Sequence, residues 1–229
     1  MNNFIPKPLV VGEIATNCWI VPLEDETPIK RGSKNCAVID PGDEAPVIVA
    51  HLRDLNLYPK YILLTHGHFD HLAALPDLLA AYTAGAAEED PVIAIHRDDA
   101  AYLGPEAYKV HCHSFAAASG DHSYIDSLWK LLPAPDRLLA EGDAIGPFTV
   151  LNTPGHTPGS VCFFWEQRKL LFSGDTLFQA GEGRTDLPGG DYQAIEKSIR
   201  RLVAMDSGIG VFPGHGDSTT IGAEQRYYR

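Results

Sequence analysis

The fold of this chain is constrained most strongly by eight short apolar runs, each rich in β-branched or aromatic residues and each followed by glycine or a polar loop. They read CWIVPL, CAVIDPG, YILLTHGH, PVIAIH, FTVLNTPGH, SVCFFW, KLLFSGD and GVFPGHGD. Between them, apolar residues at spacings of three and four predict helices over 45–57, 71–85 and 191–205. Because strands and helices do not alternate strictly, the sequence predicts an α/β (α+β) fold with sheets covered by helices.

The length of 229 residues and a hydrophobic content of 45% suit one sizeable domain with a buried core. We expect this domain to span 1–229, with a partly helical insertion at about 104–136, where no strand pattern is present. No apolar run approaches the roughly 18 to 20 residues of a membrane span, and the first residues lack the order of a secretory signal. We therefore expect a cytoplasmic protein.

The cysteines and the net charge narrow the function classes. The four cysteines form no CxxC pair and lie mostly in predicted strands, which favours buried free thiols over disulfides. They are Cys18, Cys36, Cys112 and Cys162. The net charge of −12 opposes non-specific attraction to nucleic-acid phosphates and anionic lipids. We expect neither a nucleic-acid partner nor a membrane partner, and the sequence leaves the oligomeric state open.

Histidine and aspartate side chains gather where the predicted strands end. The run LLTHGHFDHLAAL places three histidines and an aspartate within six positions directly after an apolar run. Such residues are costly to bury without a cation, and imidazole and carboxylate ligands suit zinc, iron or manganese. The ends of the predicted strands offer enough donors for two ions: His66, His68, Asp70, His71, His156, Asp175 and His215.

The remaining histidines are weaker candidates. We expect His51 and His96 on the surface or hydrogen-bonded in the core. The 104–136 segment contains four residues of types that can bind a metal, His111, Cys112, His113 and His122. They lack a clear set of partner ligands, so we expect a solvated loop there.

The motifs THGHFDH, PGHTPGS, SGDTLF and PGHG, in this order, resemble those of the metallo-β-lactamase superfamily, and within it the glyoxalase II group of hydroxyacylglutathione hydrolases. The resemblance runs from ATNCWIV to TTIGAE and implies an αββα sandwich with metals at its edge. It implies a first metal on His66, His68 and His156. It implies a second metal on Asp70, His71 and His215, with Asp175 bridging both.

The same resemblance implies a binuclear metal-dependent hydrolase that cleaves a thioester such as S-lactoylglutathione through a metal-bridging hydroxide. Two cations lower the pKa of a shared water and polarise the substrate carbonyl, so Asp70 and Asp175 are also the candidate catalytic residues. No Gly-x-Ser-x-Gly motif is present, so we expect no serine nucleophile. Asp40 is expected near the metals, where it either hydrogen-bonds a ligand imidazole or caps the turn before the first helix.

Typical glyoxalase II continues into a helical domain that supplies part of the glutathione site, whereas this sequence ends fourteen residues after His215. We expect no separate C-terminal helical domain, and the text GRTDLPGGD resembles the shorter, single-domain bacterial hydrolases. The expected partner is a small, anionic thioester. Arg184 either binds its anionic group or pairs internally with Asp186.

Other function classes stay open. Persulfide dioxygenases resemble glyoxalase II and bind one iron, for which His66, His156 and Asp175 would serve. Lactonase, β-lactamase and phosphodiesterase activities share the ligands, and a metal-binding protein without catalysis is the least favoured class. The predicted cofactor is two divalent ions, zinc first, with iron and manganese as alternatives.

Overall fold

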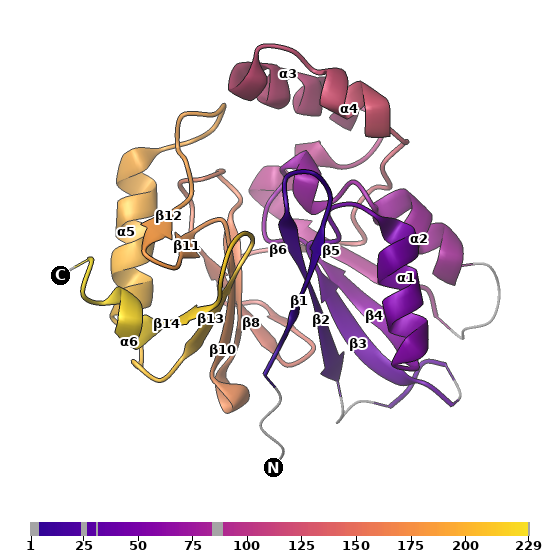
Figure 1. The fold of residues 1–229 in the computed structure, drawn as a ribbon, viewed down its shortest axis with the longest axis horizontal. Coiled ribbons are helices and arrows are strands. Elements are labelled where there is room, and N and C mark those ends of the chain that lie inside the picture. Colours follow the sequence, from indigo (N-terminus) through magenta and orange to yellow (C-terminus); the bar gives the residue numbers. More distant parts are fainter. Residues whose placement is uncertain (1–4, 24–26, 31, 84–88, 229) are drawn as a thin grey trace.

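The computed structural model describes residues 5–23, 27–30, 32–83 and 89–228. Two mixed sheets pack face to face, and helices cover both outer faces (Figure 1). The predicted αββα sandwich is confirmed.

The first sheet comes from the N-terminal part of the chain. Its strands, in spatial order, are β1 (Pro8–Val11), β2 (Thr16–Leu23), β3 (Lys34–Ile39), β4 (Leu57–Leu63), β5 (Val92–His96) and β6 (Arg137–Leu139). The first three strands are antiparallel, and the pairs from β3 to β6 are parallel. The carboxyl ends of β3, β4 and β5 therefore meet at one edge of the sandwich.

The second sheet comes from the C-terminal part. Its strands, in spatial order, are β14 (Thr219–Thr220), β13 (Gly210–Pro213), β10 (Leu170–Gly174), β9 (Val161–Trp165), β8 (Phe148–Asn152) and β7 (Ala144–Ile145). β10 and β13 are parallel, and the other pairs are antiparallel. A short hairpin follows β10, formed by β11 (Leu177–Phe178) and β12 (Gly181–Glu182).

Helices α1 (Ala45–Asp54) and α2 (Leu75–Tyr82) cover the first sheet, and α5 (Tyr192–Val203) and α6 (Ile221–Glu224) cover the second. The 104–136 segment contains α3 (Ala107–Ser119) and α4 (Ser123–Leu128), which lie across one end of the sandwich (Figure 1). The predicted helix over 71–85 begins only at Leu75, because the 3₁₀ turn η1 (Phe69–His71) intervenes; residues 84–85 lie outside the described part. The other short 3₁₀ turns are η2 (Arg97–Tyr102) and η3 (Glu166–Arg168).

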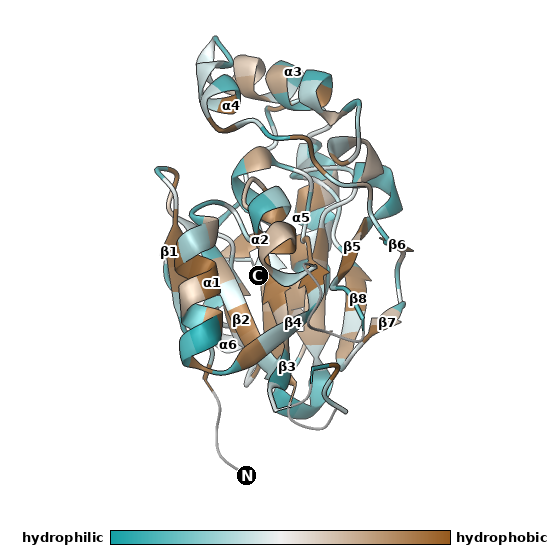
Figure 2. Cartoon of the chain, turned by 90° about the vertical axis from the view of Figure 1, so that its right-hand side faces the viewer, coloured by the Kyte–Doolittle hydropathy of each residue, from teal (hydrophilic) through white to brown (hydrophobic). Residues whose placement is uncertain are grey.

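Side chains alternate along β2, so successive residues of this strand pack into two different layers of the hydrophobic core. Trp19 and Val21 pack between the two sheets, while Cys18 and Ile20 pack toward the helices that cover the first sheet. Trp19 makes edge-to-face contact with Phe212, with ring centroids 5.3 Å apart. In Figure 2 the strands are largely hydrophobic, whereas the helices outside them mix hydrophobic and hydrophilic residues. In the part that the structure describes, no helix is long and apolar enough to cross a bilayer.

β2 also fixes the loop that follows β13 in the other sheet. The Asn17 Nδ2 atom donates hydrogen bonds to the carbonyl oxygens of Pro213 (3.0 Å) and Gly216 (2.9 Å). The Trp19 Nε1 atom donates to the same Pro213 oxygen at 3.1 Å. These buried bonds hold His215, which lies between those two carbonyls in sequence, beside the first sheet.

Candidate metal centre

The loop after β4 carries four of the predicted ligands through a sharp turn. Two histidines precede the turn, and Asp70 and His71 lie in it. Gly67 separates the two histidines, and a Cβ there would lie 2.2 Å from the ring of Tyr102, so this close approach requires glycine. One short loop thus directs four donor side chains toward the end of the sandwich.

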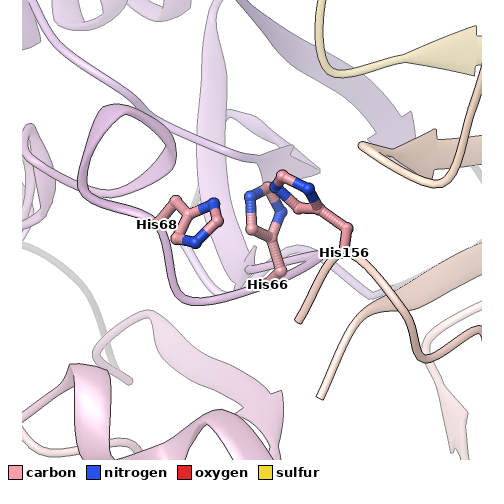
Figure 3. A group of neighbouring side chains, drawn as sticks. All are labelled: His66, His68 and His156. Carbon is pink, nitrogen blue, oxygen red and sulfur yellow. The ribbon is translucent and has the colours of Figure 1, made fainter. Parts of the chain in front are cut away.

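His66, His68 and His156 form the first group (Figure 3). The three residues are buried, and one ligand atom from each lies within 4.8 Å of the others. Their Nε2 atoms are buried without a hydrogen-bond partner among the described residues. Because an unpartnered buried nitrogen is costly, the convergence of these imidazoles fits a bound cation.

Asp70, His71 and His215 form the second group. The Asp70 Oδ2 atom lies 3.4 Å from His71 Nε2 and 3.3 Å from His215 Nε2, and the two nitrogens are 3.2 Å apart. Thr16 Oγ1 donates to the same carboxylate oxygen at 3.1 Å and orients it. A carboxylate and two imidazoles at these distances are a donor set for a divalent metal.

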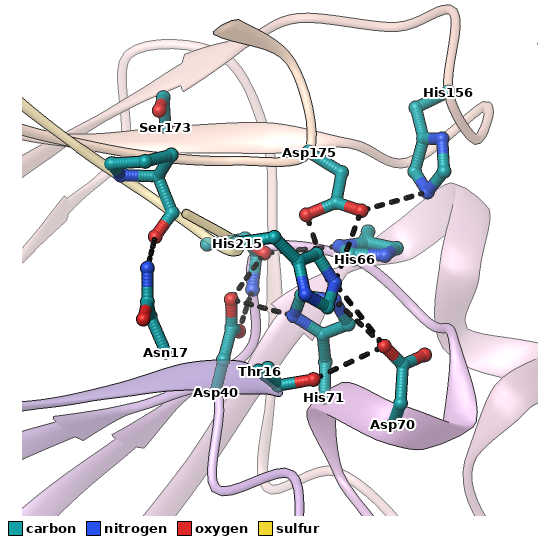
Figure 4. A network of polar contacts seen from close by, with 12 residues as sticks. Thr16, Asn17, Asp40, His66, Asp70, His71, His156, Ser173, Asp175 and His215 are labelled. Atoms are coloured by element: carbon teal, nitrogen blue, oxygen red, sulfur yellow. Dashed lines mark hydrogen bonds and ion pairs between the residues drawn. The ribbon is translucent and has the colours of Figure 1, made fainter. Parts of the chain in front are cut away.

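Asp175 lies between the two groups (Figure 4). Its Oδ1 atom is 3.5 Å from His71 Nε2, and its Oδ2 atom is 3.6 Å from both His156 Nε2 and His215 Nε2. Oδ1 is also buried without a hydrogen-bond partner among the described residues. The carboxylate thus faces both groups at once, as a bridging ligand must.

Backbone carbonyls orient two of the imidazoles. His156 Nδ1 donates to the Arg184 oxygen at 2.7 Å, and His215 Nδ1 donates to the Ala15 oxygen at 3.3 Å. In a neutral ring, a nitrogen that donates outward carries the proton, so this arrangement directs Nε2 toward the centre as the nitrogen that could bind a metal.

Protonation differs between the two groups. Burial, and then the neighbouring imidazoles, lowers the pKa of His66 well below its usual value, and burial likewise lowers the pKa of His68. Both are neutral, which is the form that binds a metal. Burial also acts to lower the pKa of His71, but Asp70 and Asp175 raise it to about 10. The second group therefore lies in a strongly negative environment that favours a cation.

Asp40 confirms one of the two predicted roles. Its Oδ2 atom accepts a hydrogen bond from His71 Nδ1 at 3.1 Å and one from Thr65 Oγ1 at 2.7 Å, while Oδ1 accepts from the Thr65 amide at 2.8 Å. The alternative role, capping the turn before the first helix, is not the one seen: among the described residues, the Asp40 carboxylate forms its hydrogen bonds with Thr65 and His71. Asp40 thus fixes both the His71 ring and the start of the ligand loop.

Asp99 is a buried carboxylate that the sequence did not single out. It accepts hydrogen bonds from the Gly67 amide (2.9 Å), from Thr157 Oγ1 (2.7 Å) and from the Gly159 amide (2.8 Å). The first donor belongs to the loop after β4 and the other two to the loop after β8. Asp99 therefore joins the two loops that form the first histidine group.

We expect Asp99→Asn to weaken metal binding and to destabilise the fold by about 1–3 kcal/mol, because the amide nitrogen faces N–H and O–H donors and leaves one unpaired. Urea unfolding of the metal-loaded protein measures the change in stability, and metal titration measures the change in metal affinity. Asp98→Asn, at the exposed neighbouring position, is the matched control. Equal stability and metal affinity in both variants would contradict the role given to Asp99.

A pocket of about 620 Å³ opens over the centre. Its floor includes His68, Asp70 and Asp175, and its apolar wall includes Phe115 of α3 and Phe178 of β11. Helices α3 and α4 form one side of the pocket, so the 104–136 segment shapes the space beside the candidate ligands.

Arg184 lies at the rim of this pocket and pairs with Asp186. Arg184 Nε donates to one Asp186 carboxylate oxygen and Nη2 to the other, both at 2.7 Å. The internal pair expected as an alternative is therefore present. The Arg184 side chain is 49% exposed, so it remains accessible from the pocket.

The other histidines lie outside the seven-residue set. His51 is exposed on α1, and the buried His96 accepts a hydrogen bond from the Asp98 amide at 3.2 Å. The expectation of a solvated loop is wrong for His111, Cys112 and His113, which lie in the helix α3, and His122 directly precedes α4. His111 is buried there, and its Nε2 donates to the Tyr102 oxygen at 2.8 Å. Burial lowers the pKa of His111 to about 4, so this ring is neutral.

The described residues bring all seven predicted ligands together, in the two groups that the resemblance implied and with Asp175 between them. Their role as ligands stays a prediction.

Comparison with known proteins identifies the family of the chain. Residues 12–215 match the family model described as the metallo-beta-lactamase superfamily. Hydroxyacylglutathione hydrolase GloC of Haemophilus influenzae is 36% identical over 202 residues, which cover 84% of this chain and 85% of that protein.

Two solved structures agree closely. A di-iron-bound form of TTHA1623 superposes with a TM-score of 0.74 and 33% identity, covering 96% of this chain and 97% of that one. The B3 metallo-beta-lactamase BLEG-1 superposes with a TM-score of 0.79 and 30% identity, covering 97% of each chain. The chain therefore belongs to the metallo-beta-lactamase superfamily, as a metallo-hydrolase with a histidine and aspartate metal site.

Proposed function

We propose that this chain is a binuclear metal-dependent hydrolase that cleaves a small anionic thioester of the hydroxyacylglutathione class, such as S-lactoylglutathione. The observation that carries the binuclear part is the position of Asp175, whose two oxygens face His71 on one side and His156 on the other. The substrate class is supported by the similarity to GloC of Haemophilus influenzae over most of both chains.

Two divalent ions fit the centre because the two groups offer six side chains, with Asp175 shared between them. His66, His68 and His156 would hold one ion, and Asp70, His71 and His215 the other. Bound there, the ions would supply a Lewis acid for the thioester carbonyl and lower the pKa of water. Zinc is the first choice, with iron and manganese as alternatives, because imidazole and carboxylate ligands select weakly among these metals.

The protein itself orients and encloses the reaction. Asp40 holds the His71 ring, and the Arg184 and Ala15 carbonyls hold the His156 and His215 rings. The pocket over the centre is lined on one side by residues of α3 and α4, among them the apolar Phe115 and Ile125. Preorganised ligands and a partly apolar pocket both favour hydrolysis at a fixed position.

The direct test is elemental analysis of the freshly purified chain, combined with a substrate panel. The panel contains S-lactoylglutathione, an oxyester with the same acyl group, a lactone and a β-lactam. At least two metals per chain and preferred turnover of the thioester support the proposal. Preferred turnover of the lactone or β-lactam would replace the substrate class.

We expect Arg184→Ala to raise KM for an anionic thioester by about tenfold while changing kcat little. The guanidinium would bind a remote charged group equally in the ground and transition states, which is uniform binding. Steady-state kinetics on charged and neutral thioesters measure the effect, with Arg200→Ala as control, because Arg200 pairs with Glu196 on the exposed face of α5. An unchanged KM on every charged thioester would exclude Arg184 from the substrate site.

A further inference from the structure

The two helices beside the pocket carry a second set of metal-ligating side chains, apart from the seven already described. Cys112 lies in α3, His122 immediately precedes α4, and Asp126 lies one turn into α4. One ligand atom from each lies within 4.8 Å of the others. We propose that Cys112, His122 and Asp126 form a binding site for a divalent metal ion such as zinc, and that this ion links α3 to α4.

The spacing suits a tetrahedral ion. Metal–ligand bonds of roughly 2.0–2.3 Å at tetrahedral angles place ligand atoms roughly 3.3–3.8 Å apart. His122 Nδ1 and Asp126 Oδ2 are already 3.0 Å apart, so small side-chain movements suffice. Three protein ligands would leave a fourth position for water.

The aspartate of this site is oriented from outside the set. Tyr108, one helical turn before Cys112, donates a hydrogen bond through its hydroxyl to Asp126 Oδ1 at 2.6 Å. This leaves Oδ2 directed at His122. A ligand carboxylate whose other oxygen is held by a neighbour is a common feature of metal sites, because the hydrogen bond fixes its direction.

The thiol distinguishes this arrangement from an ordinary surface ion pair. A histidine and an aspartate four residues apart pair on many exposed helices without a ligand. Here Cys112, from a different helix, reaches the same point, and cysteine, histidine and aspartate are all side chains that bind zinc.

The site is accessible to a metal ion. The side chains of His122 and Asp126 are 49% and 47% exposed, and Cys112 is half-buried. The other three cysteines, Cys18, Cys36 and Cys162, are buried in the strands β2, β3 and β9. Cys112 is therefore the thiol through which an entering metal ion can be detected.

An ion at this site would affect the pocket through helix position. Phe115 and Ser119 of α3 and Ile125 of α4 line the pocket over the catalytic groups. Linking the two helices fixes these side chains relative to one another. The site would thus adjust the shape of the substrate pocket without touching the reacting atoms.

Cobalt substitution tests the site by a signal that the catalytic centre cannot give. Cobalt(II) bound to a thiolate shows an intense ligand-to-metal charge-transfer band, and none of the seven predicted catalytic ligands is a cysteine. The full-length chain is loaded with Co²⁺ in steps while this band is recorded. We expect the band in the wild type, its loss in Cys112→Ser, and one metal ion fewer per chain in that variant.

The other ligands and a neighbouring residue complete the test. His122→Gln and Asp126→Asn should each raise the Kd for the charge-transfer site by at least about tenfold, since even a residue that only orients a ligand contributes that much. His113→Gln, next to Cys112 on the exposed side of α3, should leave the titration unchanged. Circular dichroism verifies the fold of each variant. The proposal is overturned if the saturated wild type shows no band, or if the band titrates identically in His122→Gln and Asp126→Asn.

Discussion

Replacing Asp175 with alanine is expected to reduce the metal bound at the seven-residue centre from two ions per chain to below one, and to lower kcat/KM for a thioester by more than about a hundredfold. Asp175 is the side chain whose oxygens face both groups, so its loss removes a ligand from each ion. Removing a residue that merely orients a ligand already costs about 10–100-fold, and a shared ligand should cost more.

Elemental analysis and steady-state kinetics on the same preparations measure this effect. Asp206→Ala is the matched control, because Asp206 is an exposed carboxylate that pairs with Lys169 far from the centre. Circular dichroism verifies that both variants fold. An Asp175→Ala protein that keeps the full wild-type metal content would show that the carboxylate does not bridge two ions.

Replacing Asp70 with alanine is expected to reduce the metal bound at the seven-residue centre from two ions to one and to lower thioester kcat by about a hundredfold or more, with a modest change in KM. Asp70 contacts His71 and His215 in the second group, whereas the first group of three histidines does not include it. The remaining single ion would lack the partner that a binuclear hydrolase uses.

The same variant separates the hydrolase from a persulfide dioxygenase. A dioxygenase with one iron on His66, His156 and Asp175 would keep its iron and much of its oxygen-dependent activity when Asp70 is lost. Metal content, thioester cleavage and oxygen consumption with a persulfide are therefore measured side by side, with Asp77→Ala of α2 as the exposed-carboxylate control. A wild type that holds one iron, consumes oxygen and tolerates Asp70→Ala would overturn the proposed function.

The sandwich and the convergence of the seven candidate ligands could be predicted because both depend on short, local sequence patterns. Apolar runs of strand length are visible in one sequence, and glycine and polar residues mark where each run ends. His66 and Asp175 each follow such a run, so their meeting at one edge follows from the strand pattern. The division into two groups needed more, namely the resemblance to a family.

Features that depend on distant contacts could not be predicted. In the sequence, Asp99 follows a strand beside another aspartate and looks like part of a solvated acidic pair. Its burial depends on three hydrogen-bond donors that lie in loops far away in the sequence. His111 lies in a segment with weak periodicity, and it is buried because aromatic rings from elsewhere in the chain pack against it, those of Phe69, Tyr102 and Trp129. Strands of two residues, such as β7 and β11, are too short to show any alternation.

Each metal group takes side chains from both layers of the sandwich: the loop after β4 supplies one part, and the loops after β8 and β13 supply the rest. An ion bound by side chains from both layers would therefore also stabilise the contact between the two layers. Because His66 and His156 are ninety positions apart, the ligand set is complete only after long-range assembly. Bound ions would thus hold the two halves of the chain together, as well as supply the chemistry of the proposed reaction.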